Sequence, residues 1–92
     1  MTFCTLVEFE FDEAFGRERF TSTIGDAGGQ TPEGRLSRIV GIDGKGARII
    51  EVWRSGDDAR AFAEKSRPFL AAAQLPPPPR AAGFEVTSYV VS

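Results

Sequence analysis

The stretch ARIIEVWRSGDDARAFAEKSRPFL, residues 47–70, decides the fold of this chain. Residues 49–53 (IIEVW) carry four bulky side chains in five positions, which is typical of a buried strand. Ser55 stands three residues before Asp58, a spacing that resembles a capping box and predicts a helix start. The next residues form a stripe with the 3.6-residue period of an amphipathic helix. The stripe consists of Ala59, Phe62, Ala63, Ser66, Phe69, Leu70 and Ala73.

Prolines are expected to limit this helix and to shape the segment after it. Pro68 lacks an N–H and its ring clashes with the preceding turn. We therefore expect a break near Ser66 and a short second helix that ends by Leu75. Residues 76–79 are all proline, which predicts a rigid spacer. The last strand is then expected over residues 84–91.

The first half of the chain predicts the remaining elements. Residues 2–11 alternate between two faces of a strand, so that Phe3, Thr5, Val7, Phe9 and Phe11 lie opposite Cys4, Leu6, Glu8 and Glu10. Residues 13–27 are expected to form a helix, because the apolar residues Phe20, Ile24 and Ala27 stand at positions i, i+4 and i+7, on one face of a helix. Residues 36–42 and 47–54 read as strands, joined by a hairpin turn that begins with Asp43-Gly44.

The order of these elements is βαββαβ. Two such strand–helix–strand halves give an α+β, ferredoxin-like fold, in which two helices cover one face of a four-stranded antiparallel sheet. We expect one domain over residues 1–92. The other face, which carries Leu6 and Glu8, needs a cover. Two copies packed face to face would supply it and would enclose a cavity, as a homodimeric α/β barrel.

Composition excludes several classes of function. The chain has a net charge of −2 and no concentrated basic face, so nucleic-acid binding is not expected. It contains no histidine and a single cysteine, Cys4, so we expect no metal site and no disulfide. We read Cys4 as a small buried apolar group. No signal peptide and no 18-residue apolar run are found, which predicts a cytoplasmic protein that does not bind a membrane.

Several short motifs give the chain a resemblance to a known family. They are Pro32-Glu33-Gly34-Arg35-Leu36-Ser37-Arg38, Glu51-Val52-Trp53-Arg54-Ser55, Ala61-Phe62, Arg67-Pro68 and Leu75-Pro76-Pro77. With them the chain resembles the antibiotic biosynthesis monooxygenase-like proteins of the dimeric α/β-barrel superfamily. That family includes cofactor-independent oxygenases of aromatic polyketides, haem-degrading enzymes and cyclases. The haem-degrading members use a His and an Asn, and this chain has neither.

The resemblance implies a protein that binds and transforms a hydrophobic or aromatic, polyketide-like metabolite by oxygenation or cyclisation, without a cofactor. Glu51 or Glu8 would accept a proton and Arg38 would stabilise an oxyanion. Trp53, Tyr89 and Leu6 would line the cavity that binds the substrate.

Each of these residues also has a purely structural interpretation. Trp53 could pack in the core or at a dimer interface, and Glu51 could form a salt bridge with Arg38 or Arg48. Tyr89 could pack its ring with its hydroxyl in water, and Arg38 could be a solvated strand residue. The alternative function is a non-catalytic dimer that binds a ligand or assists a biosynthetic enzyme.

Overall fold

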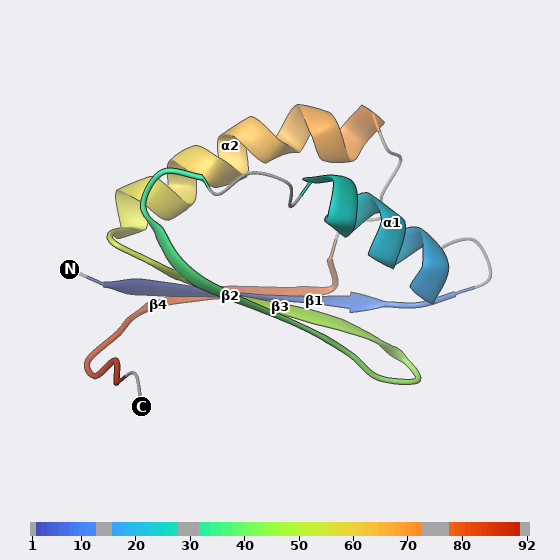
Figure 1. Ribbon diagram of the computed structural model, residues 1–92, viewed down its shortest axis with the longest axis horizontal. Coiled ribbons are helices and arrows are strands. Elements are labelled where there is room, and N and C mark those ends of the chain that lie inside the picture. Colours follow the sequence, from blue (N-terminus) through green and yellow to red (C-terminus); the bar gives the residue numbers. More distant parts are fainter. Residues whose placement is uncertain (1, 13–15, 28–31, 73–77, 91–92) are drawn as a thin grey trace.

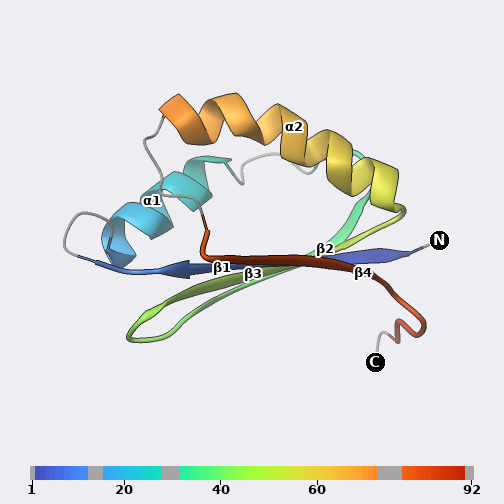
Figure 2. The same ribbon diagram turned by 180° about the vertical axis from the view of Figure 1, so that it is seen from behind.

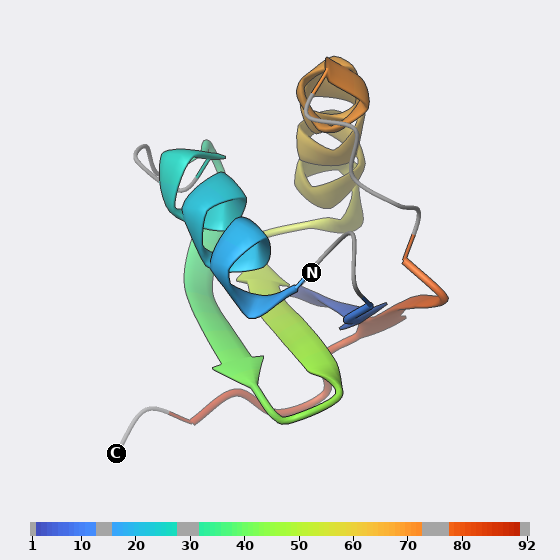
Figure 3. The same cartoon turned by 90° about the vertical axis from the view of Figure 1, so that its right-hand side faces the viewer.

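The computed structural model describes residues 2–12, 16–27, 32–72 and 78–90. Four strands form one antiparallel sheet in the order β2-β3-β1-β4. Both helices lie on the same face of this sheet (Figures 1 and 3). The elements are β1 (Phe3–Glu10), α1 (Arg17–Ala27), β2 (Arg35–Ile42), β3 (Gly46–Trp53), α2 (Gly56–Ala72) and β4 (Arg80–Glu85). The predicted ferredoxin-like α+β fold is confirmed.

The face of the sheet that the helices cover, here called the inner face, holds the core. Alternate residues of β3 point to this face, and all of them are buried (Ala47, Ile49, Glu51 and Trp53). Phe9 of β1 lies opposite Ala47 and therefore points to the same face. Phe20 of α1 packs against Phe9 with ring centroids 5.6 Å apart, which fixes α1 over this end of the sheet. The predicted alternation of β1 and β3 is confirmed.

Helix α2 covers the other end of the sheet. The Asp58 N–H donates to Ser55 Oγ at 3.1 Å, which confirms the predicted cap. The Phe62 ring packs on Trp53 at 5.2 Å and Ala59 is buried, as predicted, whereas Ala63 of the predicted stripe is exposed. The side chains of the predicted apolar residues Ile24, Ala27, Phe69, Leu70 and Ala73 lie outside the described part of the chain.

The predicted break at Ser66 is wrong, because α2 continues through Pro68. A proline removes one helical hydrogen bond and crowds the preceding turn, while the hydrogen bonds on either side can persist. Pro68 is exposed, so its ring faces solvent rather than the sheet. The predicted helix end at Leu75 lies outside the described residues.

The predicted last strand over residues 84–91 is also wrong. β4 spans Arg80–Glu85 and pairs with β1 from Arg80 opposite Glu8 to Glu85 opposite Phe3. The Val86 N–H still donates to the Thr2 carbonyl at 2.9 Å. β1 begins at Phe3, so residues 87–90 have no strand beside them in the described part of the chain. Of the proline tract, residues 76 and 77 lie outside the described part.

The second face of the sheet carries no helix (Figure 2), and we call it the open face. Register places a row of apolar residues across all four strands: Ile39, Ile50, Leu6 and Ala82. A second row adds Val52, Cys4 and Phe84. A charged row of Arg48, Glu8 and Arg80 closes one end, with Arg48 Nε 3.3 Å from Glu8 Oε1. In the described part of the chain, no helix is long and apolar enough to cross a membrane.

Candidate functional site

The structure separates the residues that the sequence suggested for a site. Glu51 and Trp53 lie on the inner face, and Arg38 lies beside them because it is the cross-strand partner of Glu51. Leu6 and Glu8 lie on the open face. Tyr89 comes after the end of β4, in a segment that leaves the sheet on the side opposite the helices (Figure 1), and it is 46% exposed. The structure therefore brings Arg38, Glu51 and Trp53 together, and it does not bring Leu6, Glu8 or Tyr89 to them.

Glu51 is a buried carboxylate with one charged partner among the described residues. Arg35 Nη1 lies 3.1 Å from Glu51 Oε2, and each side chain is only 10% exposed. The predicted partners were Arg38 and Arg48, but Arg48 pairs with Glu8 and Asp43 on the open face.

A β-bulge explains why the sequence did not indicate Arg35. The register of β2 shifts between Arg35 and Ser37, so that Arg35 faces Trp53. In a regular strand Arg35 and Arg38 would point to opposite faces, because side chains alternate. The extra residue, Leu36, turns Arg35 to the inner face. A bulge leaves little signal in a sequence, so the alternation of residues along β2 could not indicate it.

Arg38 has the least satisfied side chain near this cluster. Its Nε is enclosed and has no hydrogen-bond partner in the described part of the chain. An enclosed guanidinium donor without an acceptor costs free energy, and such groups are rare in folded proteins. An acceptor oxygen from a bound molecule would satisfy it. The neighbouring carboxylate of Glu51 is instead held by Arg35.

Trp53 lies beside this cluster, on the inner face of β3. Its side chain is fully buried at 1% exposure, and its Nε1 donates to Thr5 Oγ1 at 3.1 Å. Phe62 covers the ring from α2. The polar edge of the indole is thus already satisfied within the chain. Trp53 is therefore a core residue of the inner face, next to Arg38 and Glu51 in the sheet.

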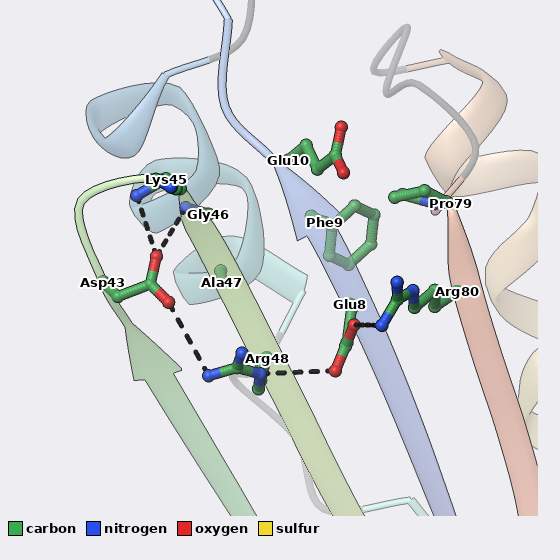
Figure 4. A pocket seen from close by; sticks show the side chains of 10 residues that line it. All are labelled: Glu8, Phe9, Glu10, Asp43, Lys45, Gly46, Ala47, Arg48, Pro79 and Arg80. Carbon is green, nitrogen blue, oxygen red and sulfur yellow. Dashed lines mark hydrogen bonds and ion pairs between the residues drawn. The ribbon is translucent and has the colours of Figure 1, made fainter.

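A pocket of about 230 Å³ lies at the opposite end of β3 (Figure 4). It is lined by Glu8, Phe9, Glu10, Asp43, Lys45, Gly46, Ala47, Arg48, Pro79 and Arg80. The Asp43 carboxylate accepts N–H groups from Lys45 and Gly46 at 2.8 Å, and these hydrogen bonds lower its pKa. Arg48 and Arg80 both lie near Glu8, at 3.3 and 3.8 Å. The charged side chains of this pocket are therefore already paired with one another. The surroundings of Arg38, whose Nε has no acceptor in the described part of the chain, are the better candidate for a ligand site.

The described residues give little support for a metal site or for a nucleophilic cysteine. No group of three or more His, Cys, Asp or Glu side chains there could hold a metal ion. Cys4 is buried, as predicted, and burial raises the pKa of its thiol. The protonated thiol is a poor nucleophile.

Strand order, register and the placement of both helices define the class: a ferredoxin-like α+β fold of the kind found in antibiotic biosynthesis monooxygenases. The chain is similar to a candidate antibiotic biosynthesis monooxygenase from Chloroflexus aurantiacus J-10-fl, with a TM-score of 0.76, 14% identity, and coverage of 99% of this chain and 98% of that one. The predicted resemblance is therefore confirmed at the level of the fold.

Two further solved structures share this fold. A monooxygenase from the gene ActVA-Orf6 of Streptomyces coelicolor, in complex with nanaomycin D, has a TM-score of 0.68 and 19% identity over 98% of this chain and 91% of that one. MupZ from Pseudomonas fluorescens has a TM-score of 0.67 and 16% identity over 89% of this chain and 66% of that one. The chain matches no family model and no curated protein. These similarities establish the fold. The activity has to be argued from the residues of the site.

Proposed function

We propose that this protein binds a small hydrophobic or aromatic metabolite between the inner face of β2 and β3 and helix α2, and transforms it without a cofactor. The observation that carries the proposal is the enclosed Arg38 Nε without an acceptor in the described part of the chain. A phenolate or enolate oxygen of a ligand would supply that acceptor in a charge-assisted hydrogen bond. The nanaomycin D complex of the similar Streptomyces protein lends support to an aromatic, polyketide-like ligand.

The chemistry that fits this site is oxygenation or cyclisation of a substrate that can form a carbanion. Glu51, held in place by Arg35, would accept the proton, and Arg38 would stabilise the oxyanion that develops. In the oxygenation, the carbanion passes an electron to O₂ and the two radicals combine to a peroxide. The reacting CH₂ group then becomes a carbonyl: one oxygen atom stays on the carbon, and the other leaves as water with the two hydrogens that the CH₂ group has lost. Leu6 and Glu8 have no place in this site, because they lie on the open face.

The open face has a different role in this proposal: it pairs with the open face of a second copy. The apolar row through Ile39, Ile50 and Leu6 crosses the sheet without a helix to cover it. Contiguous apolar patches of this kind mark interaction surfaces, and a two-fold pair buries the same patch on both copies. The active unit is then a homodimer.

One observation favours a second candidate function, a non-catalytic dimer that binds a ligand or assists a biosynthetic enzyme. Trp53, a predicted substrate contact, is fully buried and satisfied by Thr5 and Phe62. A ligand would then touch Arg38 without lying on the indole, and binding would not require a reaction.

The experiment offers an anthrone-like phenol to the protein under air and monitors both binding and turnover. Trp53 is the only tryptophan, so its fluorescence reports ligand near this cluster. We expect Arg38→Met to lower kcat/KM by about 100-fold or more, the usual effect of removing an oxyanion donor. The control is Arg60→Met, because Arg60 is 72% exposed and pairs only with Asp57 in the described part of the chain.

The result decides between the two candidate functions. Turnover that depends on Arg38 and on Glu51, tested with Glu51→Gln, supports the enzyme. Binding that depends on Arg38 without turnover by the unmodified protein supports the accessory dimer. Equal binding and equal rates for the unmodified protein, Arg38→Met and Arg60→Met contradict the assignment of the site.

A further inference from the structure

We infer that the site around Arg38 holds its ligand as an anion: a phenol or enol group of the ligand loses its proton to the solvent when the complex forms, and the proton does not stay on Glu51. The inference rests on the proposed function and names the class of ligand that the site selects, acidic phenols and enols with an apolar body. It does not depend on the later reaction with O₂. The charges of an enclosed cluster carry it.

The cluster of Arg35, Arg38 and Glu51 has an excess of positive charge. Arg35 and Glu51 form a pair at 3.1 Å, and each side chain is only 10% exposed. Arg38 keeps an enclosed Nε without an acceptor, and no ion pair joins it to another described residue. An arginine cannot give up its proton in a protein, so the cluster cannot remove this charge by itself. An enclosed charge without a partner is costly, and a bound anion would balance it.

The other charged groups near the cluster do not balance it. The inner face of the strands carries one further carboxylate, Glu85, which is exposed on β4 and separated from β2 by two strands. At the start of α2, the Asp58 carboxylate is paired with Arg54 at 3.1 Å. The residue of α2 that packs on Trp53 is the apolar Phe62, and α1 packs over the opposite end of the sheet. Among the described residues, Arg38 therefore has no counter-charge of its own.

The protonation states of the complex differ in how well they balance these charges. A neutral ligand leaves Arg38 without a counter-charge. A proton that moves from the ligand to Glu51 and stays there takes away the charge that pairs with Arg35. Only an ionised ligand beside an ionised Glu51 gives each guanidinium group one anion. Glu51 can still carry the proton on its way to the solvent, because the inference concerns the complex at equilibrium.

The surface beside Arg38 fits the apolar body of such a ligand. Val40 and Ile42 follow Arg38 on the same face of β2, because side chains alternate along a strand. They are 42% and 38% exposed, although they lie on the face that the helices cover. Side chains two residues apart on a strand are separated by about 7 Å, so an aromatic ring on Val40 places its hydroxyl oxygen beside Arg38.

Isothermal titration calorimetry counts the protons that leave on binding. The probe is 1,8-dihydroxyanthrone, titrated into the protein at pH 7 under argon, so that no reaction with O₂ takes place. Free phenols have a pKa of about 10 and are neutral at this pH. The binding enthalpy is measured in PIPES, HEPES and Tris, and its slope against the ionisation enthalpy of the buffer gives the number of protons released. We expect about one proton for each ligand bound.

A matched pair of variants tests the charge balance itself. Val40→Glu places a carboxylate on the face of β2 that carries Arg38, whereas Val40→Gln adds a side chain of the same length without the charge. Circular dichroism verifies that both are folded. We expect Val40→Glu to raise the Kd of the probe about tenfold or more above that of Val40→Gln, because the new carboxylate balances Arg38 before the ligand arrives. Any binding that remains in Arg38→Met should release no proton.

The outcomes separate this inference from the proposed function. Binding without release of a proton overturns the inference, because the ligand is then neutral or its proton stays on Glu51, and turnover of the probe in air leaves the proposed function standing. Equal affinities of Val40→Glu and Val40→Gln overturn it as well, as does a proton release that persists in Arg38→Met. Proton release that depends on Arg38 supports the inference with or without turnover. An unmodified protein that does not bind the probe overturns both.

Discussion

Arg35 and Arg38, three residues apart on β2, have opposite electrostatic surroundings. Arg35 lies 3.1 Å from a buried carboxylate, Glu51, whereas Arg38 keeps an enclosed Nε without an acceptor in the described part of the chain. Removing one partner of a buried pair leaves an uncompensated charge, which is strongly destabilising. Removing an unsatisfied donor carries no such penalty and can even stabilise the fold.

Two substitutions that preserve side-chain volume test this difference. We expect Arg35→Met to lower the free energy of unfolding by about 3 kcal/mol. We expect Arg38→Met to leave it unchanged or to raise it by about 1 kcal/mol. Urea unfolding at pH 7 measures both, with the exposed Arg60→Met as control. Equal losses for Arg35→Met and Arg38→Met would show that Arg38 has a structural partner and is not kept for a ligand.

The sequence predicted the environment of some site residues and not of others. The period of two along residues 47–54 places Glu51 and Trp53 on one face, and the structure confirms that both are buried. The same period separates Glu8 from Phe9, but it does not say which face the helices cover. Arg35 could not be predicted, because the bulge before Ser37 reverses its direction.

At the scale of elements, the start of α2 combines a cap and an ion pair. The Asp58 carboxylate accepts hydrogen bonds from Arg54 Nε at 3.1 Å and from Ser55 Oγ at 3.0 Å, and these bonds lower its pKa below 3.8. Gly34, at φ 85°, packs closely against the Asp58 side chain, so the same carboxylate also fixes the approach to β2. A single residue thereby links the loop before β2 to the start of α2.

This arrangement predicts a pH-dependent contribution to stability. A lowered carboxyl pKa stabilises the fold above the ordinary pKa, and the contribution disappears as the pH falls through the lowered value. Asp58→Asn should therefore be less stable than the unmodified protein at pH 7, and the difference should shrink below about pH 4. Urea unfolding at pH 7, 5 and 3 measures this difference. Asp57→Asn, at a position 90% exposed, is the control and should show little effect at any pH. A difference that persists at pH 3 would contradict a role for the carboxylate charge.

Helix α2 offers a second prediction at this scale. Pro68 lies inside the helix on an exposed position, where it removes one backbone hydrogen bond without a compensating contact in the core. We expect Pro68→Ala to raise the free energy of unfolding by about 1–3 kcal/mol. Urea unfolding measures the gain, and the neighbouring exposed Arg67→Ala should change stability by less than about 0.5 kcal/mol. A loss of stability in Pro68→Ala would mean that the proline fixes a bend that the fold needs.

The errors at element scale share a physical origin. Sequence patterns report what a segment prefers, and they do not report which neighbours are available to it. Residues 84–91 have the composition of a strand, yet β4 lies over Arg80–Glu85, because the pairing with β1 sets its bounds. The order βαββαβ was predictable, since it depends on counting periodic segments and turns.

At the scale of the whole molecule, the most important feature is the apolar open face of the sheet. A chain of 92 residues buries a smaller share of its surface on folding than a larger domain does, so its stability as a monomer is limited. Exposed apolar residues on the open face and on the β2 edge add to the cost of remaining alone, among them Ile39 and Phe84. A dimer removes both from water. Folding and association would then be linked, and stability would depend on protein concentration.

The proposed dimer therefore predicts a concentration-dependent melting temperature. Because dissociation accompanies unfolding, a 100-fold rise in protein concentration should stabilise the folded dimer by about 2.7 kcal/mol and raise Tm by roughly 5–10 °C. Differential scanning calorimetry over this range measures the shift. Ile39→Glu places a charge on the open face at a position 61% exposed in the single chain, so it should abolish the concentration dependence while retaining the fold.

Ala61→Glu is the matched control for this experiment, because Ala61 is exposed on α2, on the other side of the molecule. It introduces the same charge and should keep the full shift in Tm. A melting temperature independent of concentration in the unmodified protein would mean that the open face stays in water. Loss of the shift in both variants would mean that added negative charge, rather than the open face, controls association. Only loss in Ile39→Glu alone assigns the interface to the open face, since the two proteins differ in where the charge lies and not in how much is added.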